Sequence, residues 1–195
     1  MVADHSDADI IAASLEDAAA FGELFERHHQ SIFKYVARRA DPAAAGDIAA
    51  DVFTTAFSLR HRYDLAYDNA RPWLYGIARN LLRDVRRGRG RASAAYVRLA
   101  VDAETTYRSP EAETEARLGV EALERALKKL HRRDAEALLM YAVEGMEYAE
   151  IAEVLEIKLG TVKSSINRAR KKIGELVATD RPTTEWGSDE RGDPT

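Results

Sequence analysis

The sequence predicts an all-α protein of two small helical domains joined by a flexible linker, the second domain a helix-turn-helix. Three observations predict this fold class. Runs of alternating apolar and polar residues are absent, while the helix formers Ala, Leu, Glu and Arg dominate. Apolar residues recur at helical spacing in two blocks. Between them, residues 92–109 lose this period and become small and polar, as a linker does.

The first domain is predicted to cover residues 1–91, of which residues 1–7 are expected to be disordered. A helix is predicted over about residues 17–40. Its apolar stripe consists of Phe21, Leu24, Phe25, His28, Ile32, Tyr35 and Val36. Asp41 as N-cap and Pro42 at the first helical position predict a second helix, which runs to about residue 60. Its inward side chains are Ile48, Val52, Phe53, Ala56 and Phe57.

A polar loop at residues 61–69 leads into the most informative helix of the chain. Asn69 can cap this helix, and Pro72 fits its first turn. One face is apolar, formed by Trp73, Leu74, Ile77, Leu81, Leu82 and Val85, and this spacing favours a core position for Trp73 over a base-stacking one. Residues 71–91 also contain seven arginines and one acid, Asp84. A helix that is buried on one side and cationic on the other is suited to binding phosphates.

The second domain is predicted over residues 110–178, followed by a frayed tail at residues 179–195. Pro110 opens a helix whose apolar positions are Leu118, Leu123, Leu127 and Leu130. Asp134 is expected to cap the next helix, which Gly145 closes. A short helix over residues 148–155 and a tight turn at residues 156–159 precede a last helix over about residues 160–177. Residues 158–172 hold six basic residues and no acid, as a DNA-recognition helix does.

Composition and charge exclude several other classes of protein. The formal net charge is −4, but residues 1–26 and 134–156 each hold seven acids and no Lys or Arg. Local charge decides binding, because screening acts over roughly 8 Å. Without cysteine there is neither a disulfide nor a thiolate zinc site. His28 and His29 are adjacent and point in different directions on a helix, so they form a poor metal pair. No metal and no cofactor is expected.

The chain has no targeting or membrane segment that the sequence reveals. No apolar run approaches the roughly twenty residues that span a bilayer. The acidic N-terminus does not have the pattern of a signal peptide. A soluble, cytoplasmic protein without membrane insertion is therefore expected.

Two blocks of motifs resemble bacterial RNA polymerase sigma factors. Residues 45–53 and 73–80 resemble the second conserved region of that family. Residues 144–152, 160–164 and 168–170 resemble its fourth region. The chain is short and has no large third region between the two blocks, which is typical of the extracytoplasmic-function (ECF) group. The blocks occur in the right order.

The sequence departs from the family pattern at five positions. Gly46 and Ala50 stand where the family's core-binding helix usually has Glu and Gln. Glu147 replaces a usual Ser or Thr, and Glu156 replaces a frequent Gly, so Glu156 must tolerate an unfavourable turn conformation. Ser165 stands where an Arg is common at a position facing DNA, which predicts an unusual promoter sequence.

The resemblance implies that the protein binds core RNA polymerase, directs it to promoters and is not an enzyme. The first domain is expected to read and open the minus-ten element, through arginines that hold phosphates and tyrosines that capture an unstacked base. The candidates are Arg62, Tyr63, Tyr67, Asn69, Arg79, Asn80, Arg83, Arg86 and Arg87. Four of these candidates share one helix and are expected on its solvent side: Arg79, Arg83, Arg86 and Arg87.

The second domain is expected to read the minus-thirty-five element with a recognition helix in the major groove. Its candidates are Lys158, Thr161, Lys163, Ser164, Ser165, Asn167, Arg168, Arg170 and Lys171. Core polymerase is expected to contact Asp47, Asp51 and Phe53. Besides core polymerase and promoter DNA, an anti-sigma factor is an expected partner.

Other interpretations remain open at this stage. A helix-turn-helix regulator that binds an operator is the main alternative, although it does not need the arginine-rich helix. An enzyme is disfavoured, because the sequence contains no Ser-His-Asp set, phosphate-binding Gly loop or metal cluster. A regulatory hypothesis is that acids of residues 1–26 and 99–119 fold back on the cationic helices in the free protein. The alternative for those acids is a role in solubility.

Overall fold

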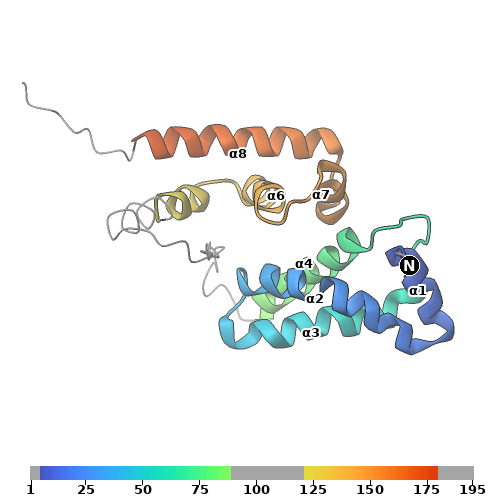
Figure 1. Ribbon diagram of the computed structural model, residues 1–195. Helices are drawn as coiled ribbons and strands as arrows, with labels where there is room; N and C mark the ends of the chain where they lie inside the picture. The colour runs from blue at the N-terminus through green and yellow to red at the C-terminus, as the bar shows by residue number, and fades with distance from the viewer. Residues whose placement is uncertain (1–4, 89–120, 180–195) are drawn as a thin grey trace, which may run out of the picture.

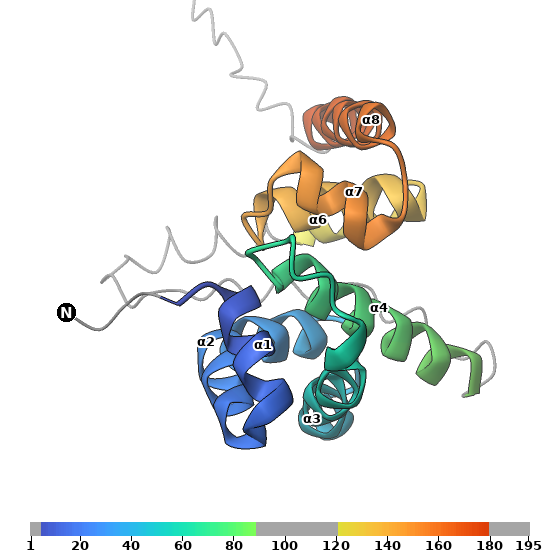
Figure 2. The same ribbon diagram turned by 90° about the vertical axis from the view of Figure 1, so that its right-hand side faces the viewer.

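The computed structural model describes residues 5–88 and 121–179, and every regular element within these ranges is helical. The helices form two units that stack on one another (Figure 1). Figure 2, turned by 90°, shows the same order: α8 lies outermost, α6 and α7 come next, and α4 follows with the rest of the first unit beneath it. The predicted all-α fold class is confirmed.

The elements of the first unit are, in chain order, α1 (Asp7–Glu16), η1 (Ala18–Ala20), α2 (Phe21–Ala37), α3 (Pro42–Leu59), η2 (Arg60–Arg62) and α4 (Arg71–Gly88). The expected caps are confirmed: Asp41 Oδ1 accepts a hydrogen bond from Ala43 N at 3.1 Å, and Asn69 Oδ1 accepts one from Arg71 N at 2.9 Å. These bonds satisfy backbone donors that a helix leaves unpaired at its start.

The expectation of disorder up to residue 7 was wrong for the described residues 5–7. Ser6 caps α1 through a capping box in which its side chain accepts from Asp9 N and the Asp9 carboxylate accepts from Ser6 N. Such a box stabilises a helix start without any apolar pattern. Asp7, the first residue of α1, is buried.

The core of the first unit is formed where α2, α3 and α4 meet. Tyr35, Val52 and Leu74 are fully buried there, and the apolar face predicted for α4 is confirmed by the burial of Leu74, Ile77 and Leu82. Trp73 is half-buried against this core. One inward assignment was wrong: Phe25 is exposed at the outer edge of α2, because the buried stripe passes through Leu24 and Ile32.

The second unit contains a helical segment at residues 121–128, then α6 (Arg132–Ala142), α7 (Tyr148–Leu155) and α8 (Leu159–Thr179). His131, not Asp134, is the N-cap of α6, because His131 Nδ1 accepts from Arg133 N at 3.3 Å. Gly145 has φ 64°, as its predicted role at the helix end requires. The linker at 92–109, the helix start at Pro110, Leu118 and residues 180–195 lie outside the described residues.

The turn between α7 and α8 depends on a strained residue. Glu156 has φ 55° and ψ 46°, in the left-handed region. This region costs a non-glycine residue roughly 1–2 kcal/mol. The predicted unfavourable conformation of Glu156 is therefore confirmed. The turn lets Val162 and Ile166 of α8 pack into the core of the second unit against Ile151.

Candidate nucleic-acid interface

The outer face of α8 carries most of the polar residues predicted to contact DNA. The exposed members are Lys158, Lys163, Ser164, Asn167, Arg170 and Lys171, and Thr161 is half-buried. They lie on and just before the first turns of a helix whose other face is buried. Arg170 is steadied by the ring of Tyr141, with its guanidinium carbon 4.9 Å from the ring centroid. This arrangement leaves a cationic and amide-bearing row free to enter a groove.

Ser165 and Arg168, also predicted to contact DNA, make contacts within the protein instead. Ser165 is fully buried, and its hydroxyl accepts from Arg168 Nη2 at 3.1 Å. Arg168 also donates from Nε and Nη2 to the two carboxylate oxygens of Asp134, at 3.0 and 2.9 Å. This bidentate bond holds the pKa of Asp134 below its ordinary value, against the effect of burial. Arg168 therefore ties α8 to α6, and its charge is already compensated.

The arginines of α4 do not all face solvent, so that expectation was wrong in part. Arg79 is 20% exposed, and its Nε donates to Glu136 Oε1 of the second unit at 3.2 Å. Arg83 has a buried Nε without a hydrogen-bond partner. Arg86 and Arg87 are exposed, Arg87 to 72%, although burial of the guanidinium and nearby Arg132 lower the pKa of Arg86. The second unit packs on this face, which helical period alone does not show.

The loop at residues 61–69 presents aromatic and amide groups at the surface. Tyr67 and Arg62 are exposed, and the Tyr63 hydroxyl donates to Tyr67 O at 2.6 Å. The Tyr63 ring lies 5.0 Å from that of Trp73, which places it against the start of α4, and burial raises the pKa of Tyr63. Asn69 Nδ2 donates to Glu150 Oε1 at 2.9 Å, so one candidate is bound to the second unit. Asn80, on α4, is half-buried.

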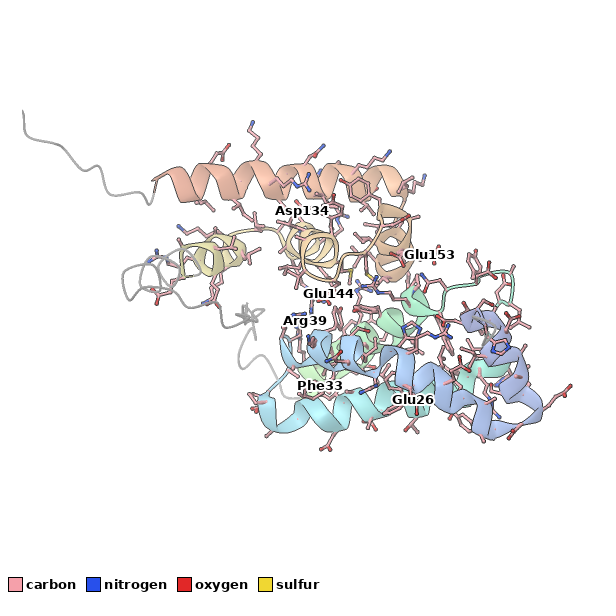
Figure 3. All side chains as sticks on the ribbon, in the orientation of Figure 1. Glu26, Phe33, Arg39, Asp134, Glu144 and Glu153 are labelled. Atoms are coloured by element: carbon pink, nitrogen blue, oxygen red, sulfur yellow. The ribbon has the colours of Figure 1, made fainter. Side chains whose placement is uncertain are left out.

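A cluster around Glu144 joins the two units, and sequence reasoning missed it. Arg38 and Arg39 donate to the Glu144 carboxylate at 3.3 Å, and the Tyr75 hydroxyl donates to it at the same distance. Arg71 donates to the Glu144 backbone carbonyl. Figure 3 labels Arg39 and Glu144, which lie side by side at the boundary between the units. No sequence signal pairs an acid of one unit with arginines about a hundred residues earlier.

Two polar groups in and beside this cluster lack hydrogen-bond partners. The Tyr35 hydroxyl and Arg39 Nη2 are buried without a hydrogen-bond partner. Burial raises the pKa of Tyr35 to about 12, so the phenol stays neutral at physiological pH. Buried polar groups without partners cost free energy. The boundary between the units is therefore less favourable than a hydrophobic core of the same size, which suits an interface that can separate.

Helix α3 carries the candidates for polymerase contact, and α2 packs beside it. Asp47 and Asp51 are exposed on α3, as expected, whereas Phe53 is buried. The Phe53 ring makes an edge contact, 4.9 Å between centroids, with exposed Phe25. Phe33, two turns further along α2, is 46% exposed and lies away from the second unit (Figure 3). The spacing of eight residues between Phe25 and Phe33 is the signal that marks this aromatic edge.

The described N-terminal acids do not lie on the arginines of α4. Asp7 binds Arg27 and His28, Asp9 binds Ser6, and Glu23 binds Arg27. The hypothesis of acids folding back on α4 therefore finds no support in residues 5–26. Residues 99–119, the other half of that hypothesis, lie outside the described part.

Among residues 5–88 and 121–179, no group of three or more His, Cys, Asp or Glu side chains is placed to hold a metal ion. Within the same ranges, no helix combines the length and hydrophobicity that crossing a membrane requires.

Comparison with known proteins places both blocks in one family. The family model described as Sigma-70 region 2 matches residues 24–92, and that described as Sigma-70, region 4 matches residues 120–173. The RNA polymerase sigma factor NccH of Alcaligenes xylosoxydans xylosoxydans is 30% identical, covering 85% of this chain and 90% of that protein. The ECF RNA polymerase sigma factor SigM of Mycobacterium tuberculosis (strain H37Rv) is 30% identical, covering 89% and 86%.

The fold also matches a solved structure. CnrH, in complex with the cytosolic domain of CnrY, superposes with a TM-score of 0.65 and 25% identity, covering 90% of this chain and 99% of CnrH. The likeness extends over both helical units.

Proposed function

Because the chain belongs to the sigma-70 family of RNA polymerase sigma factors, and to its ECF group, we propose that it binds core RNA polymerase and directs it to promoter DNA. Residues 1–91 act as region 2 and residues 110–178 as region 4.

The observation that carries the proposal for region 4 is the exposed row on α8. Lys163, Ser164 and Asn167 point outward just after the turn at Glu156, where a recognition helix meets base edges. Lysine and asparagine donate to acceptors that the major groove presents in a base-specific pattern. Arg170 and Lys171, further along, supply contacts to phosphates. Buried Ser165 and Arg168, which is bonded to Asp134, act indirectly by holding α8 on α6.

Region 2 reads and opens the minus-ten element. The exposed ring of Tyr67 and the side chains of Arg62 and Asn69 form an edge on which an unstacked base can lie. Arg86 and Arg87 extend this surface along α4 toward the phosphates. No catalytic residue is needed for opening, because binding of the single strand offsets the lost base stacking.

Core polymerase binds the face of α2 and α3 that is turned away from the second unit. Asp47 and Asp51 supply negative charge there, and Phe25 and Phe33 supply exposed aromatic surface. Large aromatic rings beside charges are typical of protein interfaces. Buried Phe53 contributes by supporting the ring of Phe25.

The arrangement of the two units bears on regulation. Asn69 and Arg79 are bound to Glu150 and Glu136 of the second unit, so they can contact DNA only after the units separate. CnrH is held in a complex with the cytosolic domain of CnrY. By analogy, an anti-sigma partner binds this chain and keeps it from polymerase.

Run-off transcription with purified core enzyme on a library of promoters tests the proposal. The chain should restore specific initiation, and core enzyme alone serves as the control. The alternative is a regulator that binds an operator without polymerase. That alternative predicts DNA binding by the free chain, no initiation, and no core polymerase retained on the immobilised chain.

A further inference from the structure

Asp7 forms a buried junction between α1, α2 and the start of α4. Its side chain is only 5% exposed. Oδ2 accepts from Ala70 N at 2.9 Å and from His28 Nε2 at 2.8 Å, and Oδ1 accepts from Arg27 Nη1 at 3.0 Å. One carboxylate thus binds α2 on one side and, on the other, Ala70, the residue that follows the loop at residues 61–69.

The backbone of Asp7 makes a second bond to the same loop. Asp7 N donates to Asp68 O at 3.0 Å. Asp68 and Ala70 are the neighbours of Asn69, whose side chain caps α4 and bonds to Glu150. The two bonds from Asp7 therefore fix the backbone on both sides of a residue proposed to read DNA.

The other end of α1 holds the opposite stem of the loop. Arg60 Nε, at the start of η2, donates to Ser14 O at 3.2 Å. Between the stems, the loop makes its own turn, with Tyr67 N donating to Asp64 O at 3.1 Å. Figure 1 shows α1 beside the segment that connects α3 to α4. Helix α1 therefore contacts both ends of the loop, through Asp7 at its start and Ser14 near its end.

The electrostatics of the junction suit a positioning role. Burial opposes ionisation of Asp7, but the hydrogen bonds from His28 and Ala70 outweigh it and lower the pKa of the carboxyl group. The carboxylate is therefore ionised at neutral pH and accepts strong charge-assisted bonds. Arg27 supplies the compensating positive charge, so this acid does not repel DNA that approaches the loop.

We propose that Asp7 is a positioning residue for minus-ten recognition: by bonding Asp68 and Ala70, it holds the loop at residues 61–69 in the geometry that captures a base. The inference rests on the proposed function of that loop. Asp7 itself is too deeply buried to touch DNA.

The test uses holoenzyme assembled from core polymerase and either the wild-type chain or Asp7→Asn. The asparagine keeps the shape of the side chain, but its amide nitrogen cannot accept from Arg27 and its oxygen is neutral, so the bond that it can still accept from Ala70 N is weaker than the charge-assisted one. The probe is a single-stranded oligonucleotide with the non-template minus-ten sequence of a promoter that the wild type transcribes, varied one base at a time. Asp7→Asn should bind the preferred sequence about tenfold more weakly and lose most base preference. Its affinity for core polymerase and its minus-thirty-five preference should be unchanged.

His28→Ala is the matched control. It removes one bond to the same carboxylate but leaves both contacts to the loop, so it should keep the base preference even if it lowers stability. Amide exchange in the free chain gives a second readout that does not need assembly: Ala70 N–H should exchange about tenfold faster or more in Asp7→Asn.

The outcomes separate the two levels of the proposal. If wild-type holoenzyme shows no base preference on the oligonucleotide, the proposed function of the loop fails. If the wild type shows a preference that Asp7→Asn retains, or if Ala70 exchange is unchanged, the positioning role of Asp7 is overturned. An equal loss of base preference in His28→Ala would also overturn it, because the effect would then be general destabilisation.

Discussion

Arg39 Nη1 donates to Glu144 Oε1 across 3.3 Å, although the two residues lie 105 positions apart and belong to different helical units. Both side chains are almost completely buried. A buried carboxylate between two arginines is stable only while its partners stay in place. The closed arrangement of the two units therefore depends strongly on one acid.

Neutralising that acid should open the free protein. Glu144→Gln keeps the size of the side chain but removes the charge between Arg38 and Arg39, so separating the units should become easier by about 1–3 kcal/mol. Energy transfer between dyes on α3 and α8 should fall. Glu121→Gln, exposed on the second unit, is the control and should leave the transfer unchanged. Equal transfer in Glu144→Gln and wild type would show that this cluster does not hold the units together.

Substitutions on α8 should divide into two kinds. Lys163→Ala and Asn167→Ala should change which minus-thirty-five sequence is selected, by about 1–3 kcal/mol per base contact. Arg170→Ala should weaken binding to all sequences about equally and reduce the salt dependence. Selection from a randomised promoter library measures both effects. An unchanged selected sequence for the Lys163 and Asn167 variants would refute their assignment to base contacts.

The Asp134–Arg168 pair should make stability depend on pH. The folded pKa of Asp134 is lowered from its ordinary value of 3.8. The stabilisation is therefore present above that value and is lost as the pH falls through the folded pKa. Asp134→Asn should lower the free energy of unfolding by about 1 kcal/mol at pH 7, because Arg168 is partly exposed.

Thermal unfolding from pH 7 down to pH 2 measures this difference. The gap between wild type and Asp134→Asn should shrink below about pH 4. Arg168→Gln should reproduce the loss at pH 7, since it removes the partner. A gap that stays constant down to pH 2 would mean that the carboxylate charge is not its source.

Charge reversal on α3 should disrupt polymerase binding without unfolding the chain. Asp51 is exposed, so Asp51→Arg leaves the core intact, and it places a cation where we propose an acid meets a basic surface. Affinity for core polymerase should fall by about tenfold or more. Glu121→Arg, exposed on the second unit, should compete for core as well as wild type does. A folded Asp51→Arg chain that also competes fully would remove Asp51 from the interface.

Local patterns predicted much of the fold. The start of α3 at Asp41 and Pro42, the bounds of α7 and the end signal at Gly145 each depend on residues within a few positions of one another. The same local logic missed α1, because Ser6 and Asp9 form a capping box that was not recognised as a helix start.

Long-range packing limited the prediction of the site. Helical period separates a buried face of α4 from a cationic one, but it does not show that the second unit covers Arg79. Ser165 was predicted from its register on the recognition helix, but it is buried beside the bond that Arg168, on the same helix, makes to Asp134 of α6. The polymerase-binding and DNA-binding assignments remain predictions until the variants above are measured.

The bond between Asp7 and Ala70 also constrains the order of folding. The two residues are 63 positions apart, whereas the turns inside α2, α3 and α4 form between near neighbours. Contacts across long separations close large loops, and their entropic cost delays them. We expect a refolding chain to acquire its helices first and the geometry of the 61–69 loop last. Pulse-labelled amide exchange should accordingly protect Ala70 after the interior of α3, so a compact chain exists for a time before it is competent to read a promoter.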